Sequence, residues 1–251
     1  IKIRESKSLE LKISAKRFNF GVTGRTGTNP GEIPYEWPVN SGQKYIAMTA
    51  LAVGTEIKLE DGTMRPMVTI PYRGDQQGNS MAWEPVPGYL NPNSSKIAIS
   101  DDGSTWPDTW PDKMEDSNDP GWTGSWNGYF GTNQFNAGQE IFYKVSDDRN
   151  YIVGHPYSPD TTDLSRKGAG IQVGVRVLEW KQILIEDVLF LLHEIKNDGS
   201  YNYNRVAFGN WMASIVGGNS DGGDDIIDFD LINDIAWSLD ADGIGAVSYT
   251  H

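Results

Sequence analysis

Hydrophobic and polar positions alternate most regularly between Gly170 and Ala213. The first part of this stretch is apolar at every second position: Ile171, Val173, Val175 and Val177. Because neighbouring side chains of a strand point to opposite faces, this pattern predicts a strand with one buried face. The run that follows, Ile183 to Ile195, fits helical spacing as well. Its density of Ile, Val, Leu and Phe, the Asn197-Asp198-Gly199 turn and the alternation from Val206 to Met212 favour an antiparallel hairpin.

Two further segments also predict strands. Apolar residues alternate with polar ones in residues 1 to 20, where the neighbouring lysines would be tolerated at a sheet edge. The apolar segment Tyr45 to Ile57 is closed by Asp61-Gly62, a favoured hairpin turn. Gly74 to Gly138, by contrast, is rich in Gly, Pro, Asn, Asp and Trp and has no sustained period. We therefore predict an all-β or β-dominated fold, an antiparallel β-sandwich with a long irregular Trp/Asp/Gly-rich insert.

The 251 residues can form one large domain or two modest ones. We expect a single extended β-rich module over 1–251. The alternative is a split near residue 165, with N-terminal strands and the insert in 1–165 and the core hairpins with an acidic loop in 166–251. The first residue, Ile1, suggests either a removed leader or a fragment, and the Tyr249-Thr250-His251 ending suggests that the natural chain continues.

Composition narrows the function classes. The absence of cysteine excludes disulfides, thiol nucleophiles and zinc sites with Cys ligands. A net charge of -13 argues against a nucleic-acid partner, because phosphate binding needs a dense basic surface. No apolar run approaches the roughly 18 residues that a membrane span requires. The charge is uneven, since basic residues crowd the first 17 positions and no Lys or Arg follows Arg205.

The acidic C-terminal segment is a candidate calcium site. Its candidate ligands lie among glycines and asparagines: Asp221, Asp224, Asp225, Asp228, Asp230, Asp240 and Asp242, with Asp234 in the same segment. Ca²⁺ takes six to eight oxygen ligands, and flexible acidic loops supply them. Asp240-Ala-Asp242-Gly243 begins like a calcium loop, but no Glu closes it. A solvated acidic loop is an equally good interpretation.

The insert carries candidate ligand-binding tryptophans beside acidic residues. These tryptophans are Trp106, Trp110, Trp122 and Trp126, and the neighbouring acids include Asp101, Asp102, Asp108, Asp112, Glu115, Asp116 and Asp119. Exposed rings flanked by carboxylates are typical of sugar-binding faces. Aromatic packing of an irregular loop explains the same residues, and we favour it.

No catalytic residue can be assigned from the sequence. The histidines, His155, His193 and His251, form no metal-binding spacing, and no nucleophile elbow or phosphate loop occurs. A glycosidase pair could be drawn from Glu36, Glu84, Glu140, Glu179, Glu186 and Glu194, but the sequence does not give their separations.

A resemblance to a known group of proteins rests on several motifs. These are Tyr35-Glu36-Trp37-Pro38 with Asn40-Ser41-Gly42, the Trp-Pro-Asp motifs at 106–108 and 110–112, Asp119 to Gly131, the Asp187 to Met212 strands and the acidic segment from Gly217. From about residue 18 onward the chain resembles the N-terminal region of large, mostly uncharacterised bacterial surface proteins exported by the type IX system. The resemblance implies a secreted, multi-domain, β-rich protein and supplies no catalytic residues.

From this we expect a non-catalytic extracellular structural or adhesive module, stabilised by Ca²⁺. Its partners would be neighbouring domains of a longer chain or other surface proteins, with no nucleic acid and no membrane insertion. A carbohydrate-binding module is the first alternative, and a glycan-active hydrolase is the second.

Overall fold

The computed structural model describes residues 5–7, 14–19, 21–24, 35–71, 82–150, 157–218 and 222–243. Over these residues the protein is built of antiparallel strands with three short 3-10 turns, and no α-helix occurs among them. The predicted β-dominated, antiparallel fold class is confirmed. No helix in the described ranges has the length and apolar character needed to cross a bilayer.

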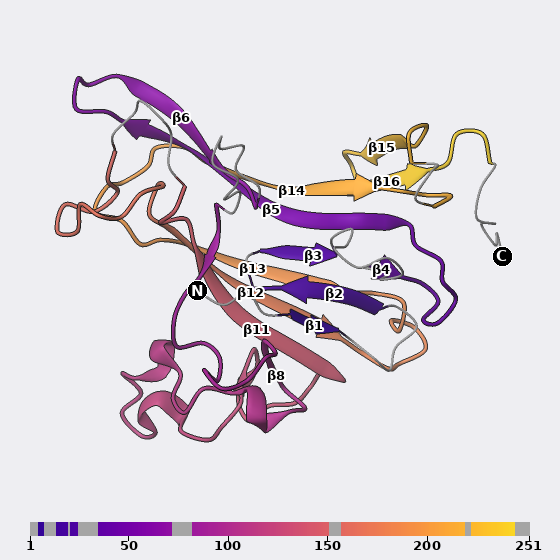
Figure 1. The fold of residues 1–251 in the computed structure, drawn as a ribbon, viewed down its shortest axis with the longest axis horizontal. Coiled ribbons are helices and arrows are strands. Elements are labelled where there is room, and N and C mark those ends of the chain that lie inside the picture. The colour runs from indigo at the N-terminus through magenta and orange to yellow at the C-terminus, as the bar shows by residue number, and fades with distance from the viewer. Residues whose placement is uncertain are drawn as a thin grey trace.

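Two large sheets form the body of the molecule (Figure 1). The first has the order β1-β2-β3-β5-β14, with β4 on β2 and β6 on β5. Its strands are β1 (Glu5–Lys7), β2 (Ser14–Phe18), β3 (Val22–Gly24), β4 (Tyr35–Glu36), β5 (Ile46–Lys58), β6 (Met64–Thr69) and β14 (Val206–Ser214). The second has the order β13-β12-β11-β7, with β8 on β11. Its strands are β7 (Glu84–Pro85), β8 (Ala98–Ile99), β11 (Gln139–Ser146), β12 (Ile171–Glu179) and β13 (Phe190–Asn197).

The hydrophobic core lies between these two sheets. Leu51 and Val53 of β5 belong to the same buried cluster as Ile141 of β11 and as Val173 and Val175 of β12. Each of these side chains is at most 5% exposed. The apolar side chains whose alternation predicted the β12 strand therefore face this shared core. Across it the two sheets pack on each other, as in a sandwich.

The β5–β6 hairpin forms where the sequence predicted it. The Leu59 amide donates to the Thr63 carbonyl at 2.9 Å, and the Asp61 carboxylate accepts from the Thr63 amide at 2.8 Å. Gly62 has a φ of 82°, a backbone conformation that glycine adopts without steric cost.

The hairpin predicted after Gly170 is wrong in two respects. Residues 183–187 form turns, with Leu184 94% exposed, so the strand begins only at Phe190. The two strands flanking Asp198-Gly199 also do not pair with each other. Instead, β13 pairs with β12 and β14 pairs with β5 of the other sheet.

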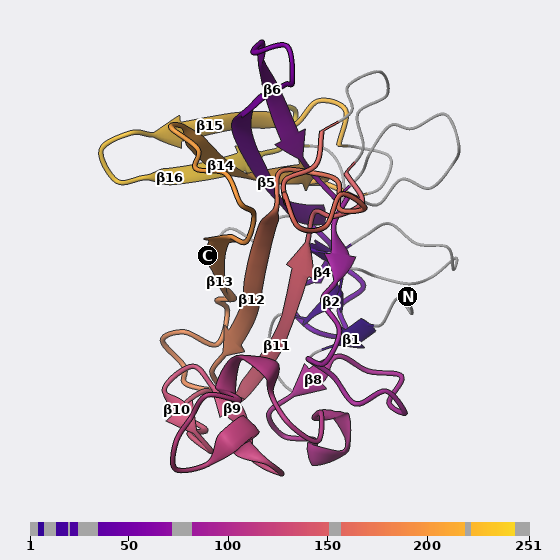
Figure 2. The ribbon, with the colours of Figure 1, turned by 90° about the vertical axis from the view of Figure 1, so that its left-hand side faces the viewer.

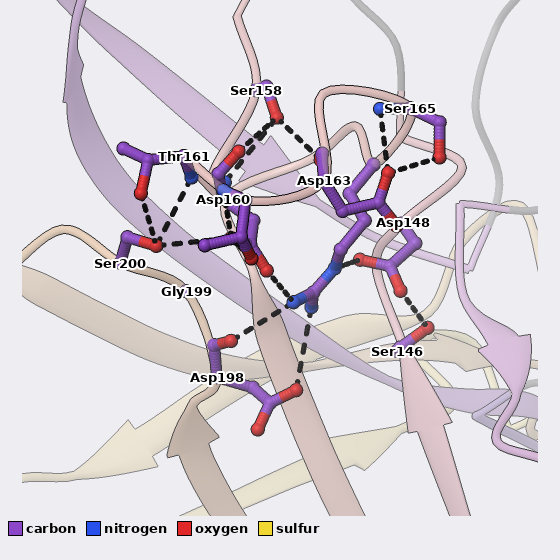
Figure 3. A network of polar contacts seen from close by, with 12 residues as sticks. Ser146, Asp148, Ser158, Asp160, Thr161, Asp163, Ser165, Asp198, Gly199 and Ser200 are labelled. Atoms are coloured by element: carbon purple, nitrogen blue, oxygen red, sulfur yellow. Dashed lines mark hydrogen bonds and ion pairs between the residues drawn. The ribbon is translucent and has the colours of Figure 1, made fainter.

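The reason for this crossover lies in the loop beside Gly199 (Figure 3). The Ser200 amide donates to the Pro159 carbonyl at 2.8 Å, and a Cβ at Gly199 would meet that carbonyl oxygen at 2.8 Å. The turn is thus tied to the 157–170 loop rather than closed on itself, and the chain leaves toward the first sheet.

Arg166 holds that loop in place. Its guanidinium contacts the carboxylates of Asp148 at 2.9 Å, Asp160 at 3.2 Å and Asp198 at 3.5 Å. The pKa of Asp160 is lowered, first by the hydroxyl of Thr162 and also by Arg166. The Arg166 guanidinium therefore links Asp198, at the end of β13, to Asp148 before the loop and to Asp160 within it.

Smaller elements lie outside the two sheets. They are η1 (Gly103–Thr105), η2 (Pro111–Lys113) and η3 (Pro120–Trp122), and the two-stranded pairs β9 (Asn127–Gly128) with β10 (Gly131–Thr132) and β15 (Ile226–Asp230) with β16 (Ile235–Leu239). In the described part of the Trp-rich stretch, 82–138, no element exceeds three residues.

Candidate functional site

The tryptophans of the insert pack against the outer side of β11. Trp110 and Trp126 are fully buried and form one cluster with Tyr89, Ala98 and Phe142. The rings of Trp110 and Trp126 meet edge to face with centroids 5.5 Å apart. In β11, Phe142 points away from the shared core because its neighbours Ile141 and Tyr143 point into it. The cluster is therefore a second core that attaches the insert to the sheet.

Each indole N–H in the insert has a partner within the protein. Trp106 donates to the Ile99 carbonyl and Trp110 to the Ser125 carbonyl, both at 2.7 Å. Trp122 donates to the Asp116 carboxylate at 3.0 Å, and Trp126 donates to Glu140 at 3.2 Å. Buried indoles need such partners, so these bonds fix the orientation of the rings.

The position of these rings bears on the sugar-binding hypothesis. Trp110 and Trp126 present no face to solvent, while Trp106 and Trp122 are half-buried against the same cluster. This burial favours the packing interpretation for Trp110 and Trp126, because a stacking platform must expose a ring face.

Three of the acidic residues beside the tryptophans, Asp102, Asp112 and Asp116, form local hydrogen bonds. Asp116 accepts from the amides of Asn118 and Asp119, and Asp102 caps the η1 turn through Ser104. Asp112 accepts from the Asn127 side-chain amide at 3.1 Å. Bonds of this kind lower the pKa of Asp116, first through Trp122, and of Asp102, first through Ser104. They stabilise the irregular backbone of the insert.

A buried ion pair fastens the insert to both central strands of the second sheet. Glu140 of β11 and Arg176 of β12 approach to 2.5 Å, with side chains 3% and 13% exposed. Glu140 also accepts from the Tyr129 amide at 2.9 Å, and Arg176 donates to the Asn127 carbonyl at 2.7 Å. The guanidinium lies over the Phe142 ring, 3.7 Å from its centroid. Burial lowers the pKa of Arg176, and the charge of Glu140 opposes that shift.

Sequence reasoning missed a set of exposed aromatic residues at the tip of the insert. Tyr129, Phe130 and Phe135 are each 52–53% exposed. Tyr129 and Phe130 contact edge to face at 5.0 Å, and Phe135 stacks on Trp106 at 6.4 Å. The signal available in the sequence was Asn127-Gly128 followed by two aromatics and Gly131, which is a turn bearing large side chains.

The structure brings together some of the candidate calcium ligands. Carboxylate oxygens of Asp224, Asp240 and Asp242 lie within 4.8 Å of one another. One Ca²⁺ with its ligands at 2.3–2.6 Å could span this separation, so the three carboxylates fit a shared ion. Asp240 accepts through one oxygen from the amides of Asp242 and Gly243, which leaves its second oxygen for a ligand role.

The other candidates lie apart from this group or outside the described residues. Asp225 accepts from the Val216 amide at 3.1 Å, which ties the β15–β16 segment to the end of β14. Asp230 accepts from Ile232 and Asn233 in the turn between the two strands, and Asp228 accepts from the Phe229 amide. Asp221 lies outside the described residues.

Four of the residues considered for catalysis are buried, partly buried or form ion pairs within the fold. His193 lies on β13, and burial lowers its pKa. Glu84 pairs with Arg149 at 2.6 Å, Glu140 with Arg176, and Glu179 is buried at the end of β12. Asp147 is also buried, and this raises its pKa to about 6 despite bonds from Ala169, Ile171 and Thr69. His155 and His251 lie outside the described residues.

Comparison with known proteins adds no assignment. No protein-family model, no curated protein and no solved structure matches the chain. The proposals below therefore depend on the geometry described above.

Proposed function

We propose that this chain is a non-catalytic structural or adhesive module of an extracellular bacterial surface protein. The observation that carries the proposal is the attachment of the insert. The hydrogen bonds of its buried indoles and of the Glu140–Arg176 pair hold the insert against β11 and β12. The extracellular bacterial setting is inferred from the motifs of the sequence.

Exposed apolar residues supply a means of contact with other proteins. The β15–β16 hairpin displays Phe229, Ile232 and Trp237, which are 61%, 92% and 39% exposed. A two-stranded hairpin is marginal alone in water, and large exposed apolar surfaces mark sites of protein association. These features support a module that contacts other proteins through its exposed apolar side chains.

Calcium belongs to this proposal as a stabilising ion at Asp224, Asp240 and Asp242. We expect the melting temperature to rise on adding millimolar Ca²⁺ to the chelated protein, because an ion that binds only the folded state adds stability by mass action. In the Asp240→Asn, Asp242→Asn double variant the rise should disappear. Asp234→Asn, which removes a charge from the same segment outside the cluster, should retain it. Equal melting temperatures with chelator and with calcium would exclude this role.

A carbohydrate-binding module is the second candidate, and the exposed Tyr129, Phe130 and Phe135 favour it. Rings on a protein surface can stack on the apolar faces of sugars. A glycan array probed with the folded chain separates the two functions. The structural role predicts no binding, whereas binding that depends on these three rings would replace it.

A further inference from the structure

Asp147 is a buried carboxylate at a contact between the two large sheets. It follows β11 directly, and its side chain is fully buried. In Figure 2 the arrowheads of β6, from the first sheet, and of β11, from the second, end close to each other. There the hydroxyl of Thr69, the last residue of β6, donates to the Asp147 carboxylate at 3.0 Å. The carboxylate therefore joins one sheet to the other.

Asp147 also holds the beginning of β12. Its carboxylate accepts from the amides of Ala169 and Ile171, both at 2.8 Å, and its own amide donates to the Ile171 carbonyl at 3.0 Å. Asn150 reinforces the same junction, because its side-chain amide donates to the Thr69 hydroxyl at 2.7 Å. One carboxylate thus connects β6, the end of β11 and the start of β12.

The backbone packs closely around the Asp147 side chain. Gly168 has a φ of 72°, and a Cβ there would lie 2.6 Å from the Asp147 Cγ. The Gly168 amide donates to the Asn150 carbonyl at 2.8 Å, which holds this part of the loop in place. Such packing keeps solvent from the carboxylate, so its ionised form lacks the hydration that it has in water.

The cations near Asp147 are bound to other carboxylates. Arg166 is held by Asp148 and by two further aspartates (Figure 3), and Arg149 pairs with Glu84 at 2.6 Å. Asp147 itself forms no ion pair with any residue in the described part of the chain. Burial therefore raises the pKa of Asp147 to about 6, although three hydrogen bonds oppose the shift, and the adjacent charge of Asp148 adds to it.

Other titratable groups lie on the segments packed against Asp147. The hydroxyls of Tyr157 and Tyr203 are 3.0 Å apart, and burial raises the pKa of both residues, so they stay neutral. Burial also raises the pKa of Glu84, which therefore titrates in the same direction as Asp147. The remaining charged groups on these segments are Arg65 of β6, Asp160, Asp163 and Lys167 of the 157–170 loop, and Asp198 and Arg205 after β13.

We propose that Asp147 is a pH-sensitive link between the two sheets, which weakens the sandwich at neutral pH and strengthens it in mildly acidic solution. The ionised form leaves a buried charge without a cation, and protonation removes that cost. The bond between the sheets persists in both forms, because the Thr69 hydroxyl can accept a hydrogen bond as well as donate one. This inference concerns the fold and is independent of the proposed function.

The direction of the pH dependence follows from the folded and unfolded states of the chain. The pKa of Asp147 is about 6 in the folded protein, whereas that of an aspartate in an unfolded chain is about 3.9. The stability gained by protonation is fully present below about pH 4 and is lost as the pH rises through about 6. From about pH 7.5 to about pH 5 this residue should increase the folding equilibrium constant about tenfold.

Urea unfolding of the full chain near these two pH values tests the link. On acidification the folding equilibrium constant of the parent chain should gain about tenfold more than that of Asp147→Asn, which retains the side-chain size and removes the titration. Glu84 and His193, whose pKa values burial also shifts, are present in both proteins, so their contributions cancel. The matched control is Asp163→Asn, at an exposed aspartate of the neighbouring loop whose pKa is lowered by Ser165, and it should respond as the parent does.

A second measurement needs no variant. In NMR spectra that correlate each side-chain carboxyl carbon with its own backbone amide, the Asp147 carbon of the folded parent chain should titrate near pH 6. Asp160, whose pKa is lowered first by the Thr162 hydroxyl, should stay ionised over the same range. An Asp147 midpoint below about pH 5, or an equal response of the parent and Asp147→Asn to acidification, would overturn the inference. If Asp147→Asn does not fold, the NMR midpoint decides alone.

Discussion

Replacing Trp110 by alanine is expected to lower the free energy of unfolding by about 3 to 5 kcal/mol. The ring is fully buried and contacts Trp126 at 5.5 Å and Phe142 at 5.8 Å between centroids. Alanine would leave a cavity between the insert and β11 and would remove the donor to the Ser125 carbonyl. Urea unfolding followed by circular dichroism measures the loss.

The matched control for this variant is Tyr129→Ala, an aromatic truncation in the same insert. Tyr129 is 53% exposed, so its loss should change stability by about 0.5 kcal/mol or less. If Trp110→Ala unfolds at the same urea concentration as the parent chain, the insert does not depend on this cluster. The account of its attachment would then be wrong.

Glu140→Gln is expected to lower the free energy of unfolding by a similar amount, about 3 to 5 kcal/mol. Removing one member of a buried pair leaves the other charge without compensation. Here Arg176 would keep its position over Phe142 and its bond to the Asn127 carbonyl, but would lose the carboxylate at 2.5 Å. The free energy of unfolding from urea titration again gives the effect.

A double variant separates the charge from the packing. Glu140→Gln with Arg176→Met removes both charges and retains most of the side-chain volume, so it should be more stable than Glu140→Gln alone. The free energy of unfolding is also measured for Arg176→Met alone. If the loss in the double variant equals the sum of the losses in the two single variants, the assignment of these residues as a coupled pair is contradicted.

The sequence predicted the strand content well because local patterns determine it. Alternation in β12 and the Asp61-Gly62 turn both reflect local chemistry, and both appear as expected. The partner of β14 could not be predicted in this way. Its pairing with β5 joins residues 151 to 168 positions apart in the sequence. It depends on contacts of Asp198 and Gly199 with Arg166 and Pro159 of the 157–170 loop, which no periodicity records.

The candidate sites were predictable only in part. Residue types indicated the acidic segment, and the structure brings together Asp224, Asp240 and Asp242 while Asp228 and Asp230 bond to nearby backbone amides. The tryptophans were predicted either to pack or to bind sugars, and only the location of Phe142 on the outer face of β11 shows what Trp110 packs against. The Glu140–Arg176 pair was missed because its members come from different strands and have no shared motif.

The central claim, that this is a structural rather than a sugar-binding module, is tested most directly by one measurement. A glycan array is probed in parallel with the parent chain and with a Tyr129→Ala, Phe130→Ala, Phe135→Ala variant whose melting temperature matches that of the parent. The account predicts that neither protein binds any glycan above background. Binding by the parent chain that disappears in the folded triple variant would contradict it and would identify the tip of the insert as a carbohydrate-binding face.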